Sequence, residues 1–200
     1  MKKLGILLSG RGSNFMALKK AVDAGRINAR IAVVISNKAD AKGLEHAREC
    51  GLDAVFLNPK EFAGREAYDT ELVRVLNSYG VDLVCLAGFM RIISSVFVEA
   101  FRNRIVNIHP SLLPSFKGLD AQGQALGYGV KFAGCTVHFV DEEMDNGAII
   151  LQAVVPVMQT DSDHDLADRI LKEEHRIYPE AVALICDDRA RVEGRRVFID

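Results

Sequence analysis

IVNIHPSLLP, residues 105–114, is an apolar run of strand type that stops at a proline and carries two polar side chains near its end. Positions two apart in a strand point to the same face, so Asn107 and His109 project side by side. Pro110 fixes φ and has no N–H group, which suits a strand that is leaving its sheet. Ligands of open α/β sheets bind beyond the carboxyl ends of the strands, so this pattern predicts a site there. The alternative is a core asparagine and a core histidine that hydrogen-bond to each other.

Composition limits the classes of protein and of ligand. The chain has 200 residues, of which 49% are hydrophobic, so it is long for one domain, short for two and able to bury a sizeable core. We expect one domain over residues 1–200. The formal net charge is -2 and there is no long basic run, which argues against nucleic acid as the main ligand and leaves a small anion open.

Cysteine spacing and the N-terminus indicate the compartment. The four cysteines form no CxxC pair and no Cys/His cluster, so neither a zinc site nor a redox pair is predicted. They are typical of reduced thiols in a cytoplasmic protein. The apolar run at the N-terminus is too short for a signal peptide, and no stretch is long enough to span a membrane.

A glycine loop follows the first predicted strand, residues 4–8. Residues 9–14 read SGRGSN and supply turn residues and an N-cap, and apolar residues at helical spacing then continue to Gly25. Such a helix start offers backbone N–H groups and a positive dipole end to an anion, phosphate above all. The alternative is a tight turn made by two glycines. Phe15 stands where GxGxxG needs its third glycine and no Gly-Lys-Ser/Thr follows, so a phosphate monoester fits better than a dinucleotide or a nucleoside triphosphate.

Strands and helices alternate through the first half of the chain. The pattern predicts an α/β, Rossmann-like fold with a mostly parallel sheet there, antiparallel strands in the C-terminal half, and helices on both faces. Further strands are predicted at 31–35, 54–57, 81–87, 132–140 and 148–157. Helices are predicted at 42–50, 65–79, 121–128 and 163–186, the last bent or divided by Pro179, and a terminal hairpin at 192–199.

Four further features bear on binding and packing. The apolar loop at residues 88–93 would line a pocket for a flat aromatic ligand or form a satellite core. Residues 115–120 are predicted to be a flexible loop. His138 is interpreted as a hydrogen-bonded structural histidine. The acidic turn at 141–147 is either a solvated turn or a cation site, although the EF-hand pattern is absent.

Several stretches together resemble one known family. They are SGRGSN at 9–14, AGFMRI at 87–92, NIHPSLLP at 107–114 and GCTVHFV at 134–140. With Asp145, they are similar to the phosphoribosylglycinamide formyltransferases, the folate-dependent transformylases of purine biosynthesis, in order and over nearly the whole chain. NIHPSLLP is shared with other enzymes that use 10-formyltetrahydrofolate. The SGRGSN loop and EHRIYP at 174–179 narrow the resemblance to the phosphoribosylglycinamide formyltransferases.

The resemblance implies roles for individual residues. Asn107, His109 and Asp145 match the catalytic trio of the family. The residues implied to hold the substrate phosphate are Gly12, Ser13 and Asn14, and Glu174 is implied to hold the ribose. The residues implied to surround the folate are Arg65, Met90, Arg91, Ile92, Ile93, Asn107, Asp141 and Asp145.

The chain also departs from some relatives. Asp120 and Gly123 stand where histidine and arginine are often found, and Leu171 stands where some relatives have a lysine near the phosphate. These differences concern secondary contacts and leave the trio unchanged.

The resemblance implies formyl transfer from 10-formyltetrahydrofolate to the amine of glycinamide ribonucleotide, and the residues suit this chemistry without a metal. The amine attacks the formyl carbon, and the tetrahedral species carries an oxyanion that needs hydrogen-bond donors in place. The Asn107 amide and a protonated His109 both donate, and a carboxylate at Asp145 favours the charged imidazole. The resemblance implies that a water held by Asp145 carries the final proton.

Two other functions stay open from the sequence. A formyltetrahydrofolate deformylase would use the same trio with water in place of the amine. A non-catalytic phosphosugar-binding module would use only residues 10–14. The chain is expected to be a monomer or a homodimer.

Overall fold

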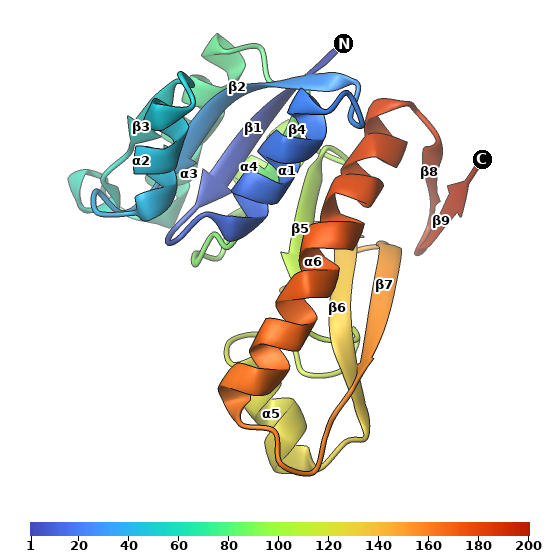
Figure 1. The fold of residues 1–200 in the computed structure, drawn as a ribbon. Helices are drawn as coiled ribbons and strands as arrows, with labels where there is room; N and C mark the ends of the chain where they lie inside the picture. Colours follow the sequence, from blue (N-terminus) through green and yellow to red (C-terminus); the bar gives the residue numbers. More distant parts are fainter.

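The computed structural model describes residues 1–200, and its centre is a seven-stranded sheet in the order β3-β2-β1-β4-β5-β6-β7 (Figure 1). Strands β1 to β5 are parallel, while β6 and β7 join by antiparallel pairing. The strands of this sheet are β1 Lys2–Leu8, β2 Ala29–Ser36, β3 Ala54–Phe56, β4 Leu83–Leu86, β5 Ile105–His109, β6 Phe132–Phe139 and β7 Ile149–Pro156. The predicted fold class is therefore confirmed.

Six α-helices and a short 3-10 helix connect the strands. They are α1 Ser13–Asp23, α2 Lys42–Glu49, η1 Pro59–Glu61, α3 Arg65–Ser78, α4 Ser95–Ala100, α5 Ala121–Tyr128 and α6 Asp163–Cys186. A small hairpin of β8 Ala190–Glu193 and β9 Arg196–Ile199 ends the chain, as predicted. None of the helices is long and apolar enough to cross a membrane.

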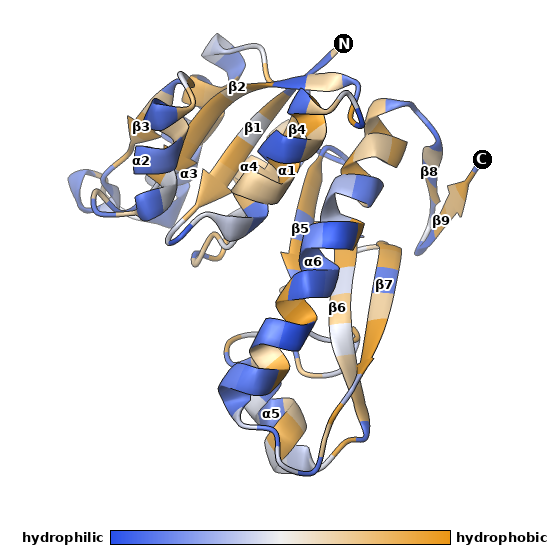
Figure 2. Ribbon diagram, in the orientation of Figure 1, coloured by the Kyte–Doolittle hydropathy of each residue, from blue (hydrophilic) through white to orange (hydrophobic).

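Alternate residues of the central strands pack into two separate hydrophobic cores. In β1, Leu4, Ile6 and Leu8 pack on the side of α1, α2 and α6. Leu7 packs on the opposite side with α3 and α4. Figure 2 shows the central strands apolar over most of their length and α6 alternately polar and apolar. This distribution is what a parallel sheet buried on both faces requires.

The side-chain directions in β5 place two polar groups on the face away from α6. Val106 and Ile108 lie in the core that contains α6, so Asn107 and His109 point to the other face. In the antiparallel pair with β6, Asn107 lies opposite His138. The chain then leaves β5 through a loop that contains a cis peptide bond before Pro114.

The structure differs from the sequence-based expectations in four elements. The helices η1 and α4 were not predicted, because elements of three and six residues show no helical period. β4 covers only Leu83–Leu86 of the expected 81–87. Pro179 lies inside α6 without dividing it, and its side chain is buried.

Candidate active site

The end of β5 and the turn between β6 and β7 bring three predicted catalytic side chains together. His109 is 5% exposed, and its Nδ1 lies 3.5 Å from Oδ2 of Asp145. Oδ1 of Asp145 lies 3.9 Å from Nε2 of His138, which in turn is 3.2 Å from Nδ2 of Asn107. The alternative in which Asn107 and His109 hydrogen-bond only to each other is wrong, because each has another partner.

His138 orients the amide of Asn107. Its Nδ1 lies 2.8 Å from the carbonyl oxygen of Phe139, which can only accept, so Nδ1 carries the hydrogen. Burial lowers the pKa of His138, so the ring is neutral and its Nε2 accepts from the Asn107 amide. One N–H of that amide is thereby fixed, and the second remains free to donate. The prediction that His138 is a hydrogen-bonded structural histidine is confirmed.

The loop after β5 fixes the ring of His109. Nε2 lies 2.9 Å from the carbonyl oxygen of Phe116 and therefore carries a hydrogen. The 3.5 Å from Nδ1 to Asp145 is longer than a good N–H···O hydrogen bond. Nδ1 is thus the ring nitrogen left for a reacting group. Phe116 has φ 53°, a left-handed conformation that costs on the order of 1–2 kcal/mol and directs its carbonyl toward the ring.

Residues 115–120 are tied to the trio at a second point. The Gly118 N–H donates to Oδ2 of Asp145 over 2.8 Å, and Lys117 Nζ donates to Oδ1 of Asn146 over 3.1 Å. The predicted flexible loop therefore makes one contact to each member of the His109–Asp145 pair. Its position and the orientation of both side chains depend on each other.

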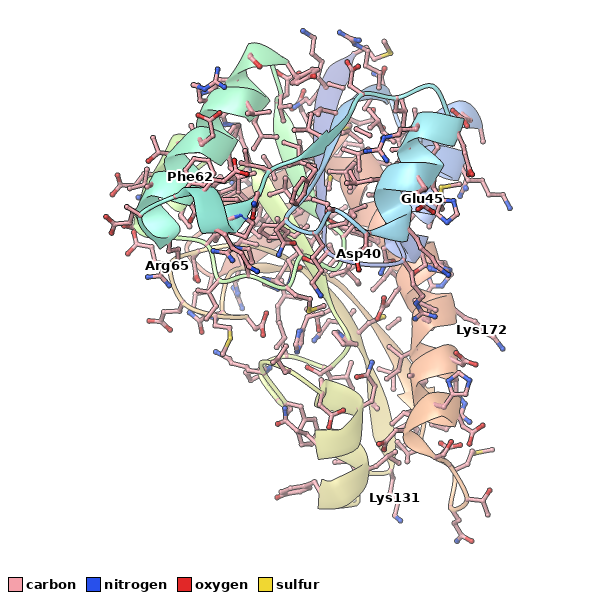
Figure 3. The ribbon with its side chains drawn as sticks, turned by 90° about the vertical axis from the view of Figure 1, so that its left-hand side faces the viewer. Asp40, Glu45, Phe62, Arg65, Lys131 and Lys172 are labelled. Atoms are coloured by element: carbon pink, nitrogen blue, oxygen red, sulfur yellow. The ribbon has the colours of Figure 1, made fainter.

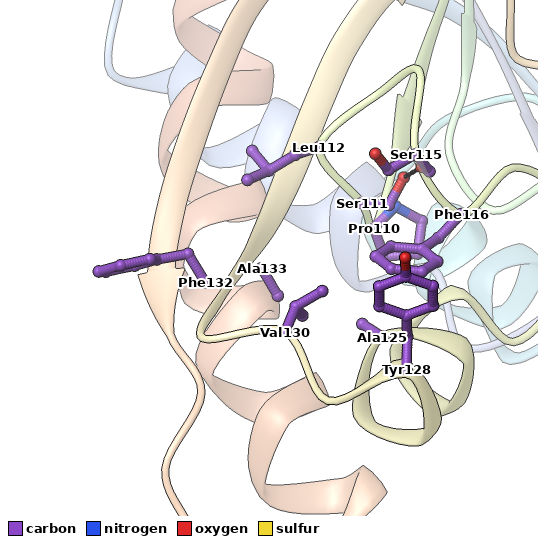
Figure 4. A pocket seen from close by; sticks show the side chains of 10 residues that line it. All are labelled: Pro110, Ser111, Leu112, Ser115, Phe116, Ala125, Tyr128, Val130, Phe132 and Ala133. Atoms are coloured by element: carbon purple, nitrogen blue, oxygen red, sulfur yellow. Dashed lines mark hydrogen bonds between the residues drawn. The ribbon is translucent and has the colours of Figure 1, made fainter.

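A cavity of about 400 Å³ lies directly behind this loop (Figure 4). It is mostly apolar and opens between the loop after β5, helix α5 and the start of β6. The lining residues are Pro110, Ser111, Leu112, Ser115, Phe116, Ala125, Tyr128, Val130, Phe132 and Ala133.

The departures at Asp120 and Gly123 form a matched pair at the start of α5. Oδ1 of Asp120 accepts from the Gly123 N–H over 3.3 Å, so the carboxylate caps the helix. A Cβ at residue 123 would collide with the same carboxylate. With this cap in place, position 123 has no room for an arginine.

The predicted phosphate loop is a close contact between two helix starts. Gly12 is the N-cap of α1, with φ 77°, and a Cβ there would lie 2.8 Å from Cα of Gly43 in α2. The Gly43 N–H donates to the carbonyl oxygen of Gly10 over 3.0 Å. The stretch supplies the N-cap, as predicted, and this residue is Gly12, so no side chain caps α1. A glycine is needed because α2 approaches the backbone too closely for any side chain.

Asn14 and Glu174 join this loop to α6. Nδ2 of Asn14 donates to Oε2 of Glu174 over 2.7 Å, and both side chains are buried. Burial raises the pKa of Glu174, while the Asn14 hydrogen bond and the charge of His109 act in the opposite direction. Oδ1 of Asn14 is buried without a partner and is available to a hydroxyl or another donor. The two predicted substrate-binding groups, far apart in the sequence, therefore lie together, and Glu174 is close enough to His109 for the charge of that ring to act on it.

The loop at residues 88–93 packs partly into a hydrophobic core, and its role in a ligand pocket stays a prediction. Phe89 is buried in the core with α3 and α4, and Ile93 packs against the same core. Met90 and Ile92 are exposed, and the Arg91 guanidinium lies over the ring of Tyr68. Arg65 is the exposed first residue of α3 (Figure 3), and its predicted contact with the folate stays a prediction.

Some carboxylate oxygens of the acidic turn accept hydrogen bonds from groups within the turn. Asp141 accepts from the Glu143 N–H over 3.0 Å and from Nδ2 of Asn146 over 3.4 Å. No group of three or more histidine, cysteine, aspartate or glutamate side chains is placed to hold a metal ion. The two interpretations of the turn stay open, and the absence of a metal from the reaction stays a prediction.

One contact of the site had no signal in the sequence. Oγ of Ser9 donates to Oδ1 of Asn37 over 2.5 Å and accepts from the Met90 N–H over 2.8 Å. The first residue of the glycine loop thus holds the apolar loop at 88–93. A serine before two glycines is ordinary in a turn, so only the sheet order, which places β1 beside β4, reveals this role.

An amide, an imidazole and a carboxylate that meet beyond the carboxyl end of β5 are the groups that acyl transfer with oxyanion donors and no side-chain nucleophile requires. Residues 2–182 match the formyl transferase family, and the chain belongs to that family.

Relatives within this family match nearly all of the chain. Phosphoribosylglycinamide formyltransferase of Escherichia coli is 44% identical over 98% of this chain and 92% of its own length. The crystal structure of glycinamide ribonucleotide transformylase 1 from Symbiobacterium toebii is 56% identical, with a TM-score of 0.98 over 100% of this chain and 94% of that one. The trifunctional purine biosynthetic protein adenosine-3 of Drosophila melanogaster is 49% identical over 96% of this chain, which spans only 14% of that protein.

Proposed function

We propose that the chain is a phosphoribosylglycinamide formyltransferase. It would move the formyl group of 10-formyltetrahydrofolate to the amine of N1-(5-phospho-D-ribosyl)glycinamide in purine biosynthesis. One observation carries this proposal. Asn107, His109 and Asp145 lie together, and the buried Asn14–Glu174 pair lies close to His109. The match to the Escherichia coli enzyme over 92% of its length supports the same substrate.

Asn107 and His109 supply the donors for the oxyanion. His138 holds the Asn107 amide through one N–H and leaves the second N–H free to donate, and the contact of Nε2 with Phe116 leaves Nδ1 of His109 available. Donors fixed before the reaction need no reorganisation when charge develops, which is where such a site lowers the barrier. Asp145 would stabilise a protonated His109. As the bond between the formyl carbon and the folate nitrogen breaks, a water held by Asp145 would pass the proton of the attacking amine to the departing tetrahydrofolate.

The phosphate and ribose contacts position the amine. Backbone N–H groups at the start of α1 and the side chains of Ser13 and Asn14 would bind the phosphate. Glu174 would accept from ribose hydroxyls. Since these groups lie away from the reacting carbon, their binding energy orients the nucleophile and excludes competing water.

The formyl donor would lie against the loop at 88–93. Met90 and Ile92 present exposed apolar surface there, and the guanidinium of Arg91 has its Nε buried without an acceptor. An apolar surface beside an unpaired cation suits a flat ring system that carries a carboxylate. We expect the enzyme to work in the cytoplasm, because all four cysteines are free thiols.

A stoichiometric assay tests this function. With 10-formyltetrahydrofolate alone we expect slow consumption, and addition of glycinamide ribonucleotide should accelerate it by orders of magnitude, with formylated ribonucleotide formed in equal amount. Rapid release of formate that is unchanged by the ribonucleotide would make the chain a deformylase. Binding of the ribonucleotide without any loss of the formyl group would make it a binding module.

A second assay tests the phosphate loop. A substrate that lacks the phosphate should bind far more weakly, because the donors at Gly12, Ser13 and Asn14 lose their ligand. Equal KM values for the two substrates would move the phosphate site elsewhere.

A further inference from the structure

Three buried polar atoms without a hydrogen-bond partner lie around the loop at residues 88–94. They are the hydroxyl of Tyr68, Nε of Arg91 and Oγ of Ser94. Buried polar groups are almost always paired, so such a group of exceptions calls for a physical explanation. The guanidinium lies over the ring of Tyr68, with 4.7 Å between Cζ of Arg91 and the ring centroid.

The backbone on both sides of Arg91 is held by buried side chains. Oγ of Ser9 accepts from the Met90 N–H over 2.8 Å, and Oδ2 of Asp69 accepts from the Ser94 N–H over 2.5 Å. Asp69 is 1% exposed and follows Tyr68 in α3. The loop therefore has little freedom to move, and the position of the Arg91 guanidinium depends on the surface beneath it.

That surface is the face of Tyr68. The ring is fully buried, and Phe62 contacts it edge-on at 5.6 Å between centroids, so it cannot turn away. A guanidinium stacked on an aromatic face is attracted by the ring but keeps its charge and its N–H donors. Burial raises the pKa of Tyr68 to about 12, so the phenol stays neutral beside the cation.

The same face of α3 carries a second cation. Arg65 and Tyr68 are three residues apart in the helix, so their side chains lie on one side of it. Arg65 is exposed at the first turn, and Met90 and Ile92 expose apolar side chains next to Arg91 in the loop. The Arg91 guanidinium beside exposed apolar side chains suits a carboxylate attached to a ring system, and Arg65 would add a second cation from the first turn of α3.

We propose that Tyr68 is a positioning residue that holds the Arg91 guanidinium, through its aromatic face, in the orientation that binds a glutamate carboxylate of the folate. This inference rests on the proposed function and assigns the ring a share in formyl-donor affinity. The ring does not touch the reacting atoms, so it affects binding of the donor and leaves the chemical step alone.

Steady-state kinetics of Tyr68 variants test this role. Tyr68→Leu removes the aromatic face and should raise KM for 10-formyltetrahydrofolate about fivefold to tenfold, the effect of a partly buried cation–π contact. The turnover number and KM for glycinamide ribonucleotide should change less than about twofold on the same basis. Tyr68→Phe keeps the aromatic face and should keep the parental KM for 10-formyltetrahydrofolate. A formyl donor that lacks the glutamate should not distinguish Tyr68→Leu from the parent protein.

A double-mutant cycle separates positioning from general stability. If the ring acts through the guanidinium, Tyr68→Leu should add nothing to KM in an Arg91→Met background. Arg104→Met is the matched control, because Arg104 stacks on Phe101 at 5.1 Å far from this loop and should leave KM unchanged. An undiminished Tyr68→Leu effect in the Arg91→Met background would overturn the inference.

Two further measurements keep the test decisive if Tyr68→Leu unfolds. Pentafluorophenylalanine at position 68 keeps the shape of the ring but reverses the charge distribution of its face, and the same rise in KM is expected. Calorimetric binding of tetrahydrofolate and tetrahydropteroate requires no turnover. If neither ligand binds the parent protein, the proposed function fails. If both ligands bind and the substituted ring lowers the affinity for both equally, only the role of Tyr68 fails.

Discussion

The ring nitrogens of His109 and His138 have fixed and different tasks. Each ring donates one N–H to a backbone carbonyl, Phe116 for His109 and Phe139 for His138. The second nitrogen of His138 accepts from Asn107, whereas that of His109 faces Asp145 across 3.5 Å. Two residues of the same type therefore differ in function because of the acceptors around them.

Removal of either oxyanion donor should lower turnover. We expect Asn107→Ala to reduce kcat by about 10²–10³, the usual effect of deleting one such donor, and His109→Ala to reduce it at least as much. Thermal unfolding should show that both variants fold. His164→Ala, at an exposed position near the start of α6, is the control and should keep parental kcat. Near-parental turnover of Asn107→Ala would refute its role.

His138 should make the protein less stable in acid. Burial lowers its pKa in the folded state, so below the ordinary histidine pKa of about 6.5 the unfolded chain binds a proton that the folded chain does not. The free energy of unfolding therefore falls as the pH drops through that value. Urea denaturation between pH 5 and 7.5 should show that the free energy of unfolding falls less steeply with falling pH in His138→Gln than in the parent protein. Identical slopes for both proteins would mean that His138 does not titrate differently on unfolding.

At the scale of elements, the anion loop depends on how closely α1 and α2 approach. Gly12 lies in a left-handed conformation against Gly43, whereas a Cβ at Gly10 would meet no atom within 4 Å. The two glycines of SGRGSN thus differ: one is required by packing and the other leaves open space.

This difference predicts unequal effects of alanine at the two positions. Gly12→Ala should destabilise the protein by at least about 1–2 kcal/mol from its positive φ alone. It should also raise KM for the phosphorylated substrate, since α1 and α2 must separate. Gly10→Ala is the matched control and should change thermal stability little. Comparable losses in the two variants would contradict the close-contact explanation.

At the scale of the molecule, the sheet order gathers the site from distant parts of the chain. β1, β4 and β5 are neighbours, so the glycine loop, the loop at 88–94 and the end of β5 meet at one edge. α6 then crosses this edge from the other half of the chain and brings Glu174 to Asn14 (Figure 1).

The assembled site predicts chemistry that needs no metal. Two hydrogen-bond donors serve the oxyanion, and the substrate amine is itself the nucleophile, so a Lewis acid has no required task. Dialysis against EDTA should leave formyl transfer at the parental rate. Loss of activity that a divalent ion restores would require the acidic turn at 141–147 to be reinterpreted as a metal site.

The sequence by itself determined the elements and the chemical nature of the site. Hydrophobic periodicity and glycine and proline positions predicted most strands and helices, because these signals act within a few residues along the chain. The two-residue period of β5 also predicted that Asn107 and His109 share a face, since side-chain direction in a strand is a local property. Short elements such as α4 lack a period and were missed for the same reason.

Only the tertiary structure decided which groups pair with which. The contacts of Asn107 with His138, of Asn14 with Glu174 and of Arg91 with Tyr68 join residues separated by 31, 160 and 23 positions. Such pairs are set by strand order and helix packing, which depend on burial summed over the whole chain and leave no mark at either residue. The requirement for glycine at position 12 has the same origin, because the neighbour that forbids a side chain comes from another helix.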